Sequence, residues 1–309
     1  MGTPELACVS FKALLDSNQF HVVAVVTQPD RPKGRDLKSL PSPVKELALR
    51  KGVAVLQPIK ARDQQFIEEV RQLHPDLIAV TAYGQILPPA SLELPRFGCL
   101  NVHTSLLPKY RGAAPIQWSI LNGDAETGVT IMKMDAGLDT GEILSQERTP
   151  ILEKDDSETL HNRLAELGAQ LLVKTIVPYA AGEIQPRPQG AEGVSYARKI
   201  AKEDGRIDWN RPAKETLNRV RGLVPWPGAF THLPPPHLEL LKIWRAEISD
   251  LSASPGEIVS ADKNGIVVGC GDRALRILAL QREGARRLTS EQFLAGRHLQ
   301  PGQRLGQAC

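Results

Sequence analysis

The sequence lacks several features that mark common classes of protein. Its four cysteines, at positions 8, 99, 270 and 309, form no Cys-x-x-Cys pair. This argues against a zinc site or a disulfide framework and fits a reducing cytoplasm. The chain has no apolar run of about 18 residues, so we expect no membrane span. No basic segment follows Met1, so we expect no secretory signal.

Three motifs of well-known enzyme classes are also absent. The sequence has no Gly-x-Ser-x-Gly elbow, which argues against a Ser-His-Asp hydrolase. It has neither a Walker phosphate-binding loop nor a Gly-x-Gly-x-x-Gly turn, so nucleotide cofactors are disfavoured. Any chemistry must therefore come from side chains that need neither a serine elbow nor a bound nucleotide.

The apolar pattern predicts two domains. Up to His103, short apolar runs alternate with helical patterns, which is typical of a parallel sheet with helices on both faces. From Thr127 the pattern changes to two consecutive strands and a long helix, which close the first domain at residue 181. We interpret residues 182–201, which are rich in Pro and Gly, as a linker. From residue 202 to residue 309, short strands with few helices predict a small β-barrel.

The individual elements follow from the same periodicities. We expect helices at Leu6–Leu15, Val44–Lys51, Phe66–Leu73, Pro115–Leu121, Ser157–Tyr179, Ala213–Leu223 and Thr289–Ala295, with Ser157 as a helix cap. We expect strands at Val22–Val26, Val53–Leu56, Leu77–Val80, Leu100–His103, Val129–Met134, Ile143–Thr149, Glu239–Glu247, Gly256–Val259, Gly265–Val268 and Ala274–Leu280.

Positive charge gathers in two parts of the chain. From Ile200 onward, 16 Lys and Arg residues stand against 12 Asp and Glu residues. A long loop between Asp30 and Lys45 is also basic. Both patterns are compatible with an ordinary solvated surface, or with a polyanionic partner such as nucleic acid.

The stretch Cys99–Pro115 contains the clearest candidate site. Asn101 and His103 point the same way from a predicted strand, at the strand end where open α/β sheets bind ligands. Asp139, in a Gly-rich loop, can orient an imidazole. Asn and protonated His can donate to the oxyanion that forms when an amine attacks a carbonyl carbon, and His can then protonate the leaving nitrogen. The set suits direct acyl transfer, although each feature alone is also common in purely structural roles.

Longer motifs around these residues resemble the folate-dependent formyltransferases. The stretch Asn101–Pro108, the run from Arg111 to Ile116 and the loop Asp135–Gly141 are similar to that family's signature. Gly2-Thr3-Pro4 and Pro225-Trp226-Pro227 are similar to flanking motifs of its tRNA-directed members. The resemblance covers nearly the whole chain. It implies a Rossmann-like formyltransferase catalytic domain over residues 1–181 and an OB-like, tRNA-binding domain over residues 202–309.

The resemblance also implies an activity. The tRNA-directed members transfer the formyl group of 10-formyltetrahydrofolate to the amino group of methionyl initiator tRNA, by direct acyl transfer through a tetrahedral intermediate. We therefore expect a cytoplasmic, monomeric, metal-free enzyme of translation initiation and one-carbon metabolism. Asn101, His103 and Asp139 match the family's catalytic residues.

Further positions match the family's binding residues. Those that match its folate-contacting turn and the walls around the pterin are Ser105, Leu106, Leu107, Pro108, Ala82, Tyr83, Gly84, Ile86, Ala136, Gly137 and Leu138. Those that match the basic insertion that enters the tRNA acceptor end are Arg31, Lys33, Arg35 and Lys38. Asp36 follows Arg35 at a position where the family usually has Gly.

One departure from the family concerns the start of the chain. The resemblance implies an apolar strand before Gly2, in the middle of the sheet, and the sequence does not contain it. We expect that the start was assigned downstream of the true one, or that the sequence is truncated. We also expect a sheet that lacks a strand next to Val22–Val26.

Three other functions stay open at this point. The acceptor can instead be an amino sugar or a purine precursor, although such an enzyme needs no basic groove. The chain can be a tRNA-binding protein without activity, although its Asn/His/Asp set is complete. The same residues can also hydrolyse formyl-folate, if water takes the place of the amine.

Overall fold

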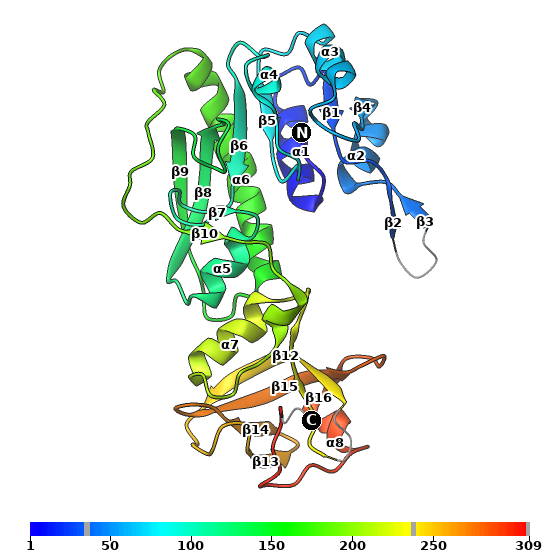
Figure 1. Cartoon of the computed structure of the whole chain (residues 1–309), viewed down its shortest axis with the longest axis vertical. Helices are drawn as coiled ribbons and strands as arrows, with labels where there is room; N and C mark the ends of the chain where they lie inside the picture. Colours follow the sequence, from blue (N-terminus) through cyan, green and yellow to red (C-terminus); the bar gives the residue numbers. More distant parts are fainter. Residues whose placement is uncertain (34–37, 236–238, 307–309) are drawn as a thin grey trace. The chain divides into compact units, whose positions relative to one another are not determined.

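The computed structural model describes residues 1–33, 38–235 and 239–306. The chain forms two compact units (Figure 1). The first contains Met1–Pro115, Glu126–Pro150 and His161–Ala197, and the second contains Ile116–Ala125, Ile151–Leu160 and Arg198–Cys309. In the part of the chain that the structure describes, no helix has the length and apolar character that crossing a membrane requires.

The first unit begins with the predicted alternation of helices and strands. Its elements are α1 (Glu5–Asp16), β1 (Ala24–Val26), α2 (Pro43–Lys51), β4 (Ala54–Leu56), α3 (Gln64–Gln72), β5 (Ile78–Val80) and α4 (Pro89–Leu92). Local sequence explains the bounds of α2: the Ser42 hydroxyl accepts from the Lys45 amide at 3.1 Å, and Gly52 ends the helix with a φ of 67°. The buried face of α3 carries Phe66, Ile67 and Val70 at helical spacing.

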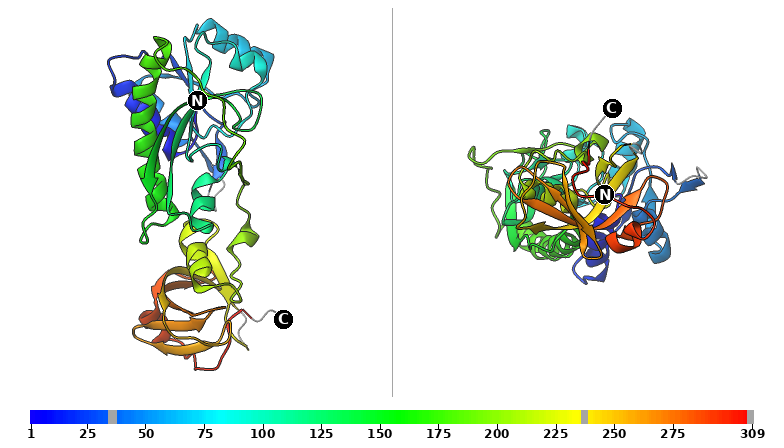
Figure 2. Two further views of the ribbon diagram at one scale, coloured as in Figure 1. Left: turned by 90° about the vertical axis from the view of Figure 1, so that its left-hand side faces the viewer. Right: turned by 90° about the horizontal axis from the view of Figure 1, so that it is seen from below.

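A four-stranded mixed sheet follows. Its strands are β5, β6 (Cys99–His103), β8 (Glu126–Lys133) and β9 (Ile143–Pro150), in that order. β5 and β6 are parallel, as the sequence predicts, whereas β8 and β9 run antiparallel to their neighbours. α6 (Ser157–Ala180) packs tightly on this sheet, since a Cβ at Gly168 would lie 2.7 Å from the Val102 side chain (Figure 2).

The sheet of the first unit is interrupted next to β1, as the sequence predicts. β1 pairs with β4, and β5 pairs with β6, in two separate sheets. Met1 and Gly2 lie between β1 and β5: the Gly2 amide donates to the Val26 carbonyl at 2.9 Å, and the Thr81 amide donates to the Met1 carbonyl at 2.9 Å.

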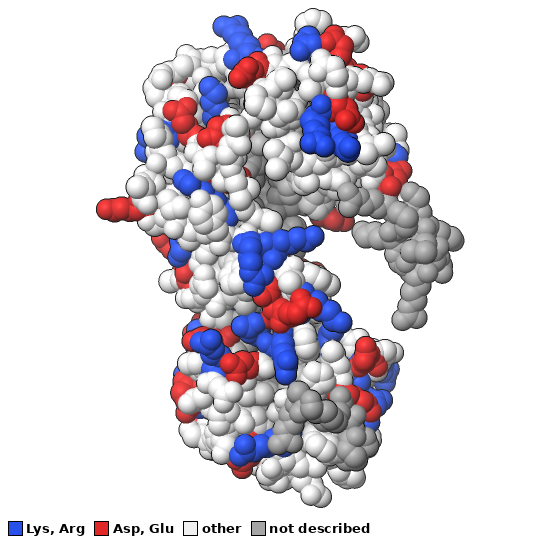
Figure 3. All heavy atoms as spheres, in the orientation of Figure 1, with Lys and Arg blue, Asp and Glu red and all other residues white. Residues whose placement is uncertain are grey.

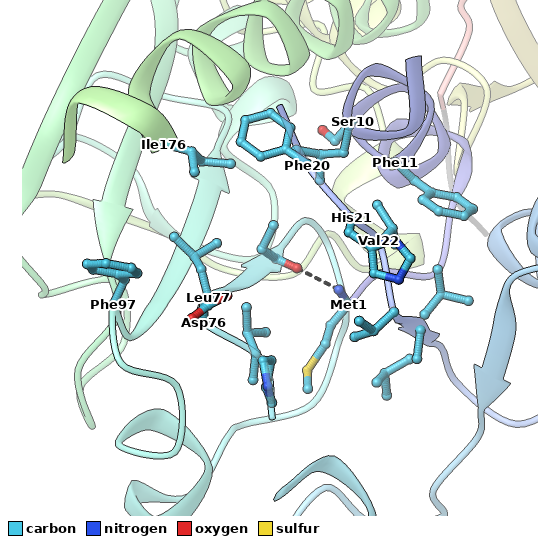
Figure 4. A pocket seen from close by; sticks show the side chains of 18 of the residues that line it. Met1, Ser10, Phe11, Phe20, His21, Val22, Asp76, Leu77, Phe97 and Ile176 are labelled. Atoms are coloured by element: carbon cyan, nitrogen blue, oxygen red, sulfur yellow. Dashed lines mark hydrogen bonds between the residues drawn. The ribbon is translucent and has the colours of Figure 1, made fainter. Parts of the chain in front are cut away.

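A cavity of about 720 Å³ lies beside these residues. Phe20, Leu77 and Ile176 are among the residues around it (Figure 4). The Met1 amino group donates to the Ala79 carbonyl at 2.5 Å, and burial lowers the pKa of this amine to about 6. The cavity lies between β1 and β5 and is lined by neither Asn101, His103 nor Asp139.

A short hairpin occupies the segment that the sequence indicates as a loop. β2 (Arg31–Lys33) pairs antiparallel with β3 (Lys38–Leu40), and the hairpin projects from the first unit (Figure 1). Asp30 anchors its base, because its carboxylate accepts from Lys45 Nζ at 2.6 Å and from Gln57 Nε2 at 2.7 Å. The Lys45 hydrogen bond lowers the pKa of Asp30.

The cap of α6 differs from the prediction. Asp156, not Ser157, caps the helix, since its Oδ1 accepts from the amides of Glu158 and Thr159 at 3.0 and 2.9 Å. The Ser157 hydroxyl donates instead to the Val224 carbonyl. A carboxylate one residue earlier competes successfully for the free amides of the first turn.

The second unit is built on an antiparallel sheet. The strands are β11 (Ala229–His232), β12 (Leu240–Ser249), β15 (Ala274–Arg282), β14 (Gly265–Gly269) and β13 (Ile258–Asp262), in that order, and β16 (Leu288–Thr289) pairs with β15. Helices α7 (Ala213–Gly222) and α8 (Ser290–Leu294) and the short η1 (Lys202–Gly205) accompany it. One apolar core joins the sheet to α7 and α8, with Leu241, Ile243 and Ile277 fully buried. The predicted β-rich C-terminal domain is therefore confirmed, and its strands pair antiparallel.

Candidate active site

The register of the mixed sheet places two other chain segments next to Asn101. Asn101 is the partner of Val80 on β5 and of Met132 on β8. The loop 81–87 continues from β5, and the loop 135–141 connects β8 to β9. The two loops that the family resemblance identified therefore leave strands that flank β6, whose residues include Asn101 and His103.

His103 is held by both of its ring nitrogens. Its Nε2 lies 2.9 Å from the Tyr110 carbonyl oxygen, and its Nδ1 lies 3.7 Å from Asp139 Oδ2. A carbonyl can only accept, so Nε2 carries the hydrogen in either charge state. The nitrogen whose protonation can change is therefore Nδ1, on the side of Asp139. Only 5% of His103 is exposed, which limits competition from water.

The carboxylate of Asp139 accepts hydrogen bonds from two strands, β6 and β7 (Arg111–Gly112). Its Oδ2 accepts from the Gly112 amide at 2.8 Å, and its Oδ1 accepts from Asn101 Nδ2 at 3.4 Å. The structure therefore brings together all three predicted catalytic residues, which the chain separates by up to 38 positions. Asp139 has a φ of 52°, in the left-handed region that non-glycine residues avoid. Such a conformation persists only where the surroundings hold it in place.

The loop that carries Asp139 is closed by short polar contacts. Asp135 Oδ1 accepts from the Gly137 amide at 3.0 Å and from the Thr140 hydroxyl at 2.8 Å. Gly141 is needed at its position, because a Cβ there would lie 1.8 Å from the Lys133 carbonyl oxygen. Ala136, Gly137 and Leu138, at the outer part of the loop, are exposed.

The turn after β6 is shaped from within by Thr130 and Gln146, which the sequence analysis missed. Thr130 Oγ1 donates to the Ser105 carbonyl at 2.7 Å and accepts from the Leu107 amide at 3.1 Å. Gln146 Nε2 donates to Thr130 Oγ1 at 3.0 Å. Both residues lie within predicted strands. The alternation of apolar residues in these strands gave no sign that Thr130 or Gln146 has a particular role.

The predicted folate-contacting residues of this turn differ in exposure. Ser105 and Leu107 are buried, and the Ser105 hydroxyl donates to the Lys109 carbonyl at 2.6 Å. Leu106 and Pro108 are half-buried. The surface that the turn offers to a ligand therefore comes from Leu106 and Pro108, while Ser105 and Leu107 hold its shape.

The loop 81–87 exposes apolar and backbone groups. Ala82 and Gly84 are exposed and have positive φ values of 46° and 82°. Ile86 is 86% exposed, and Leu138 of the other loop is 58% exposed. Tyr83 is buried, and its carbonyl accepts from Thr3 Oγ1 at 3.0 Å and from Gln28 Nε2 at 3.1 Å, which fixes the loop.

The predicted linker contributes to this site. Residues 182–197 run along the first unit, where Arg187 exchanges two backbone hydrogen bonds with Ile143. β10 (Tyr196–Ala197) pairs with β7 (Arg111–Gly112), directly beside the Gly112 amide. Gln189 contacts Arg111, Asp139 and Gly141. The Pro- and Gly-rich composition of this segment predicted only a linker. The segment has no apolar periodicity from which these contacts could be predicted.

The predicted tRNA-binding side chains fall largely outside the description. Arg35 lies within residues 34–37, which the structure does not describe, and only the backbone of Arg31, Lys33 and Lys38 is described. Within the described residues, no group of three or more His, Cys, Asp or Glu side chains is arranged to hold a metal ion.

Charges of both signs cover the second unit. On the face that Figure 3 shows, its Lys and Arg side chains lie among Asp and Glu side chains. Several pair directly: Arg198 with Asp204, Arg276 with Glu247, and Arg297 with Glu239. Elsewhere in the unit, the Arg287 guanidinium lies 4.0 Å above the Trp244 ring.

Comparison with known proteins identifies two family matches. The model of the formyl transferase family matches residues 2–176, and that of the formyl transferase C-terminal domain matches residues 199–298. The chain is 52% identical over 306 residues to the methionyl-tRNA formyltransferase of Citrifermentans bemidjiense, covering 99% of this chain and 95% of that protein. It is 47% identical to the enzyme of the same name from Geobacter sulfurreducens, covering 100% and 96%.

Solved structures share the fold at lower identity. An N-formyltransferase from Helicobacter canadensis, in complex with folinic acid and dTDP-3-aminofucose, matches with a TM-score of 0.64 and 21% identity, over 93% of this chain and 97% of that one. HypX from Aquifex aeolicus, in complex with tetrahydrofolic acid, matches with a TM-score of 0.58 and 20% identity, over 81% and 43%.

Proposed function

The chain belongs to the formyl transferase family, and from this premise we propose that it formylates the amino group of methionyl initiator tRNA. It is a formyltransferase of translation initiation, and its substrate is of the folate type. The observation that carries the proposal is the convergence of Asn101, His103 and Asp139 at the middle of the sheet. We also propose that the protein is a monomer and that it acts in the cytoplasm.

We propose 10-formyltetrahydrofolate as the formyl donor. A pterin is a flat ring with polar edges, so it needs apolar walls and backbone groups that point at its rim. Ile86 and Leu138 are large apolar side chains left exposed, which suits a surface that a ligand covers. Ala82, Gly84, Ala136 and Gly137 present backbone next to them in sequence. These residues fit the ring of the donor.

In the proposed mechanism, the amino group of the methionyl ester attacks the formyl carbon. A carbon–nitrogen bond forms, and the formyl oxygen takes the negative charge. Asn101 Nδ2 is the donor that we assign to this oxygen from the start, and His103 Nδ1 becomes a second donor once it has taken the proton of the attacking amine. Such donors, fixed before the reaction, favour the tetrahedral transition state over the planar substrate.

The proton of the attacking amine must leave, and the departing folate nitrogen must gain one. Asp139 lies 3.7 Å from His103 Nδ1 and can stabilise the charge that the imidazole gains when it takes a proton. His103 then returns the proton to the leaving nitrogen as the carbon–nitrogen bond of the donor breaks. Since Nε2 is bound to the Tyr110 carbonyl, Nδ1 is the atom that we assign to both transfers.

We assign tRNA contacts to the hairpin β2–β3 and to the second unit. The hairpin carries Arg31, Lys33, Arg35 and Lys38 within a short stretch, which provides the charge that a phosphate backbone attracts. The second unit adds an excess of Lys and Arg over Asp and Glu. An enzyme for a small neutral acceptor needs neither feature.

The test is formylation by the purified protein. We expect formyl-methionyl-tRNA to form from 10-formyltetrahydrofolate and initiator methionyl-tRNA, and we expect Asn101→Ala, His103→Ala and Asp139→Ala each to reduce kcat by about 100-fold or more. Affinity for tRNA should fall steeply with salt.

Controls separate the alternatives. A dTDP-amino sugar and free methionine serve as competing acceptors, and either one reacting faster than the tRNA would overturn the assigned acceptor. Release of formate without acceptor would instead indicate hydrolysis. If the His103→Ala enzyme kept its rate within a few-fold, the role given to His103 would be wrong.

A further inference from the structure

Gln189 makes four hydrogen bonds with one side chain. Its Oε1 accepts from Arg111 Nε at 3.0 Å and from Arg111 Nη2 at 2.7 Å. Its Nε2 donates to the Asp139 carbonyl and to the Gly141 carbonyl, both at 2.8 Å. Arginine can only donate and a carbonyl can only accept, so this amide has a single possible orientation. Because both atoms of this amide group are engaged in hydrogen bonds, the side chain of Gln189 is held in one position and links Arg111 to the Asp139 loop.

The side chain of Gln189 binds the backbone of Asp139, which has an unfavourable conformation. Asp139 adopts a φ of 52°, which must be maintained by its surroundings. Gln189 binds the carbonyl of Asp139 itself and that of Gly141, two residues further on. It therefore holds both ends of the short turn through which the Asp139 carboxylate is directed at His103.

The contacts form a closed ring. Gln189 binds Arg111, the next residue Gly112 donates its amide to Asp139 Oδ2 at 2.8 Å, and the Asp139 carbonyl returns to Gln189. One side chain thus fixes the acceptor carboxylate and its backbone donor relative to each other. Loss of Gln189 leaves two carbonyls and one guanidinium without these bonds.

The chain around Gln189 is itself anchored to the first unit. Arg187 is joined to Ile143 at the start of β9 by hydrogen bonds of 2.9 and 2.8 Å. Further on, Ser195 Oγ accepts from the Tyr110 amide at 2.9 Å, and Tyr110 is the residue whose carbonyl binds His103. These contacts fix the segment on both sides of Gln189, so the side chain of Gln189 has a fixed position relative to the site.

From this arrangement we propose that Gln189 is a positioning residue for the transfer reaction, acting through Asp139. It does not touch the reacting atoms. Its role is to keep the carboxylate of Asp139 within reach of His103 and Asn101, so that the imidazole is oriented before the amine attacks. The inference rests on the proposed function of the site and names a residue of it that neither motif nor composition marked.

Gln189→Leu and Gln189→Glu are the informative variants. Leu keeps most of the volume and removes all four hydrogen bonds, whereas Glu keeps the acceptors for Arg111 and sets a carboxylate against two carbonyl oxygens. We expect both to lower kcat by about ten- to a hundredfold, since a displacement of about 1 Å at a reacting group can cost that much. KM for the tRNA should stay within about twofold, because Gln189 contacts none of the residues that we assign to tRNA binding.

Gln185→Leu is the matched control. Gln185 lies in the same segment and donates to the Gly182 carbonyl at 2.9 Å, on the exposed surface. We expect its kcat to equal that of the wild type. If Gln185→Leu lowered kcat as much as Gln189→Leu, the effect would belong to the segment as a whole, and the proposal would be wrong.

A double-mutant cycle distinguishes positioning from general support of the fold. In an Asp139→Ala background, Gln189→Leu should change the remaining rate by less than about twofold, because its target is gone. An undiminished effect in that background would overturn the proposal. Wild-type formylation of methionyl-tRNA, measured alongside, tests the proposed function separately.

A crystal structure of the Gln189→Glu protein supplies a readout that needs no activity. We expect Asp139 to leave the left-handed region and its carboxylate to lose the Gly112 amide. An unmoved Asp139 in that structure would refute the positioning role, even if the protein proved to have another acceptor.

Discussion

His103 donates from Nε2 to the carbonyl oxygen of Tyr110, 2.9 Å away, so its other nitrogen faces Asp139. The two ring nitrogens therefore have different roles: Nε2 holds the ring in place, and Nδ1 is the atom that we assign to the reaction. Two substitutions can separate them, because the amide of Gln reaches the place of Nε2 and the amide of Asn reaches the place of Nδ1.

We predict that His103→Asn and His103→Gln fail for different reasons. Neither amide can carry a proton between substrates, so kcat should fall by about 100-fold or more in both. Asn retains an N–H on the Asp139 side and should keep the higher residual rate, whereas Gln retains the Tyr110 contact and should keep the higher melting temperature. Formylation rates and thermal unfolding of both proteins check this, and the reverse order would assign the reactive role to Nε2.

We predict that Gly141→Ala disrupts the Asp139 loop. Its Cβ would lie 1.8 Å from the Lys133 carbonyl oxygen, and a backbone atom cannot move aside cheaply. The loop must shift, so we expect a fall in kcat of about tenfold or more. Gly190→Ala is the control, because no atom lies within 4 Å of the added Cβ. Equal rates for the two variants would show that the loop tolerates the shift.

We predict that Asp30→Ala weakens tRNA use without affecting the chemistry. Asp30 ties the hairpin base to Lys45 and Gln57, and a partly exposed ion pair contributes about 0–1 kcal/mol. KM for tRNA should therefore rise by no more than about fivefold, with KM for the folate unchanged. Glu46→Ala removes a looser ion pair from the neighbouring helix and serves as the control. A change confined to the folate KM would contradict the assignment.

We predict that Asp272 stabilises the second unit in a pH-dependent way. Its Oδ1 accepts from the amide of Ala213, the first residue of α7, at 2.7 Å, and this bond holds the pKa of Asp272 below its usual value. The folded pKa is the lower one, so the stabilisation is complete above about pH 4 and is lost as the pH falls further.

Unfolding in urea at pH 7 and at pH 3 measures this contribution. Asp272→Ala should lower the free energy of unfolding by about 1 kcal/mol at pH 7, as loss of a helix cap does, and by less at pH 3. Asp250→Ala, which removes a fully exposed carboxylate, is the control. A deficit of equal size at both pH values would mean that the carboxylate charge contributes nothing.

Sequence reasoning located the elements whose pattern repeats along the chain. α5 (Pro115–Leu121) has the predicted bounds, and α2, β4 and β14 differ from them by one residue at an end. These elements have local causes: a cap, a Gly terminator or a continuous apolar run. β7 and β10 escaped prediction because two residues on each side are too few to show a period, and their pairing joins distant parts of the chain.

The site shows the same division. Asn101 and His103 are separated by one residue on a strand, so their common direction follows from the period of two. The left-handed conformation of Asp139 and the contacts of Gln189 depend on a ring closed over long sequence separations. The residue types near Gln189 do not predict these hydrogen bonds, since a Pro- and Gly-rich stretch is also typical of a linker without such contacts.

The second unit is built from segments that lie far apart in the sequence, so its parts are synthesised at different times. Ile120 belongs to the second unit and is fully buried there, with Gly222 of α7 packed closely against it. Ile120 leaves the ribosome about a hundred residues before that helix, at a translation rate of about 5–20 residues per second. For several seconds the nascent chain must leave this apolar segment without the partner that buries it in the folded protein. A chain that ends between Ala197 and Gly222 would therefore contain every segment of the first unit, while its second unit could not close.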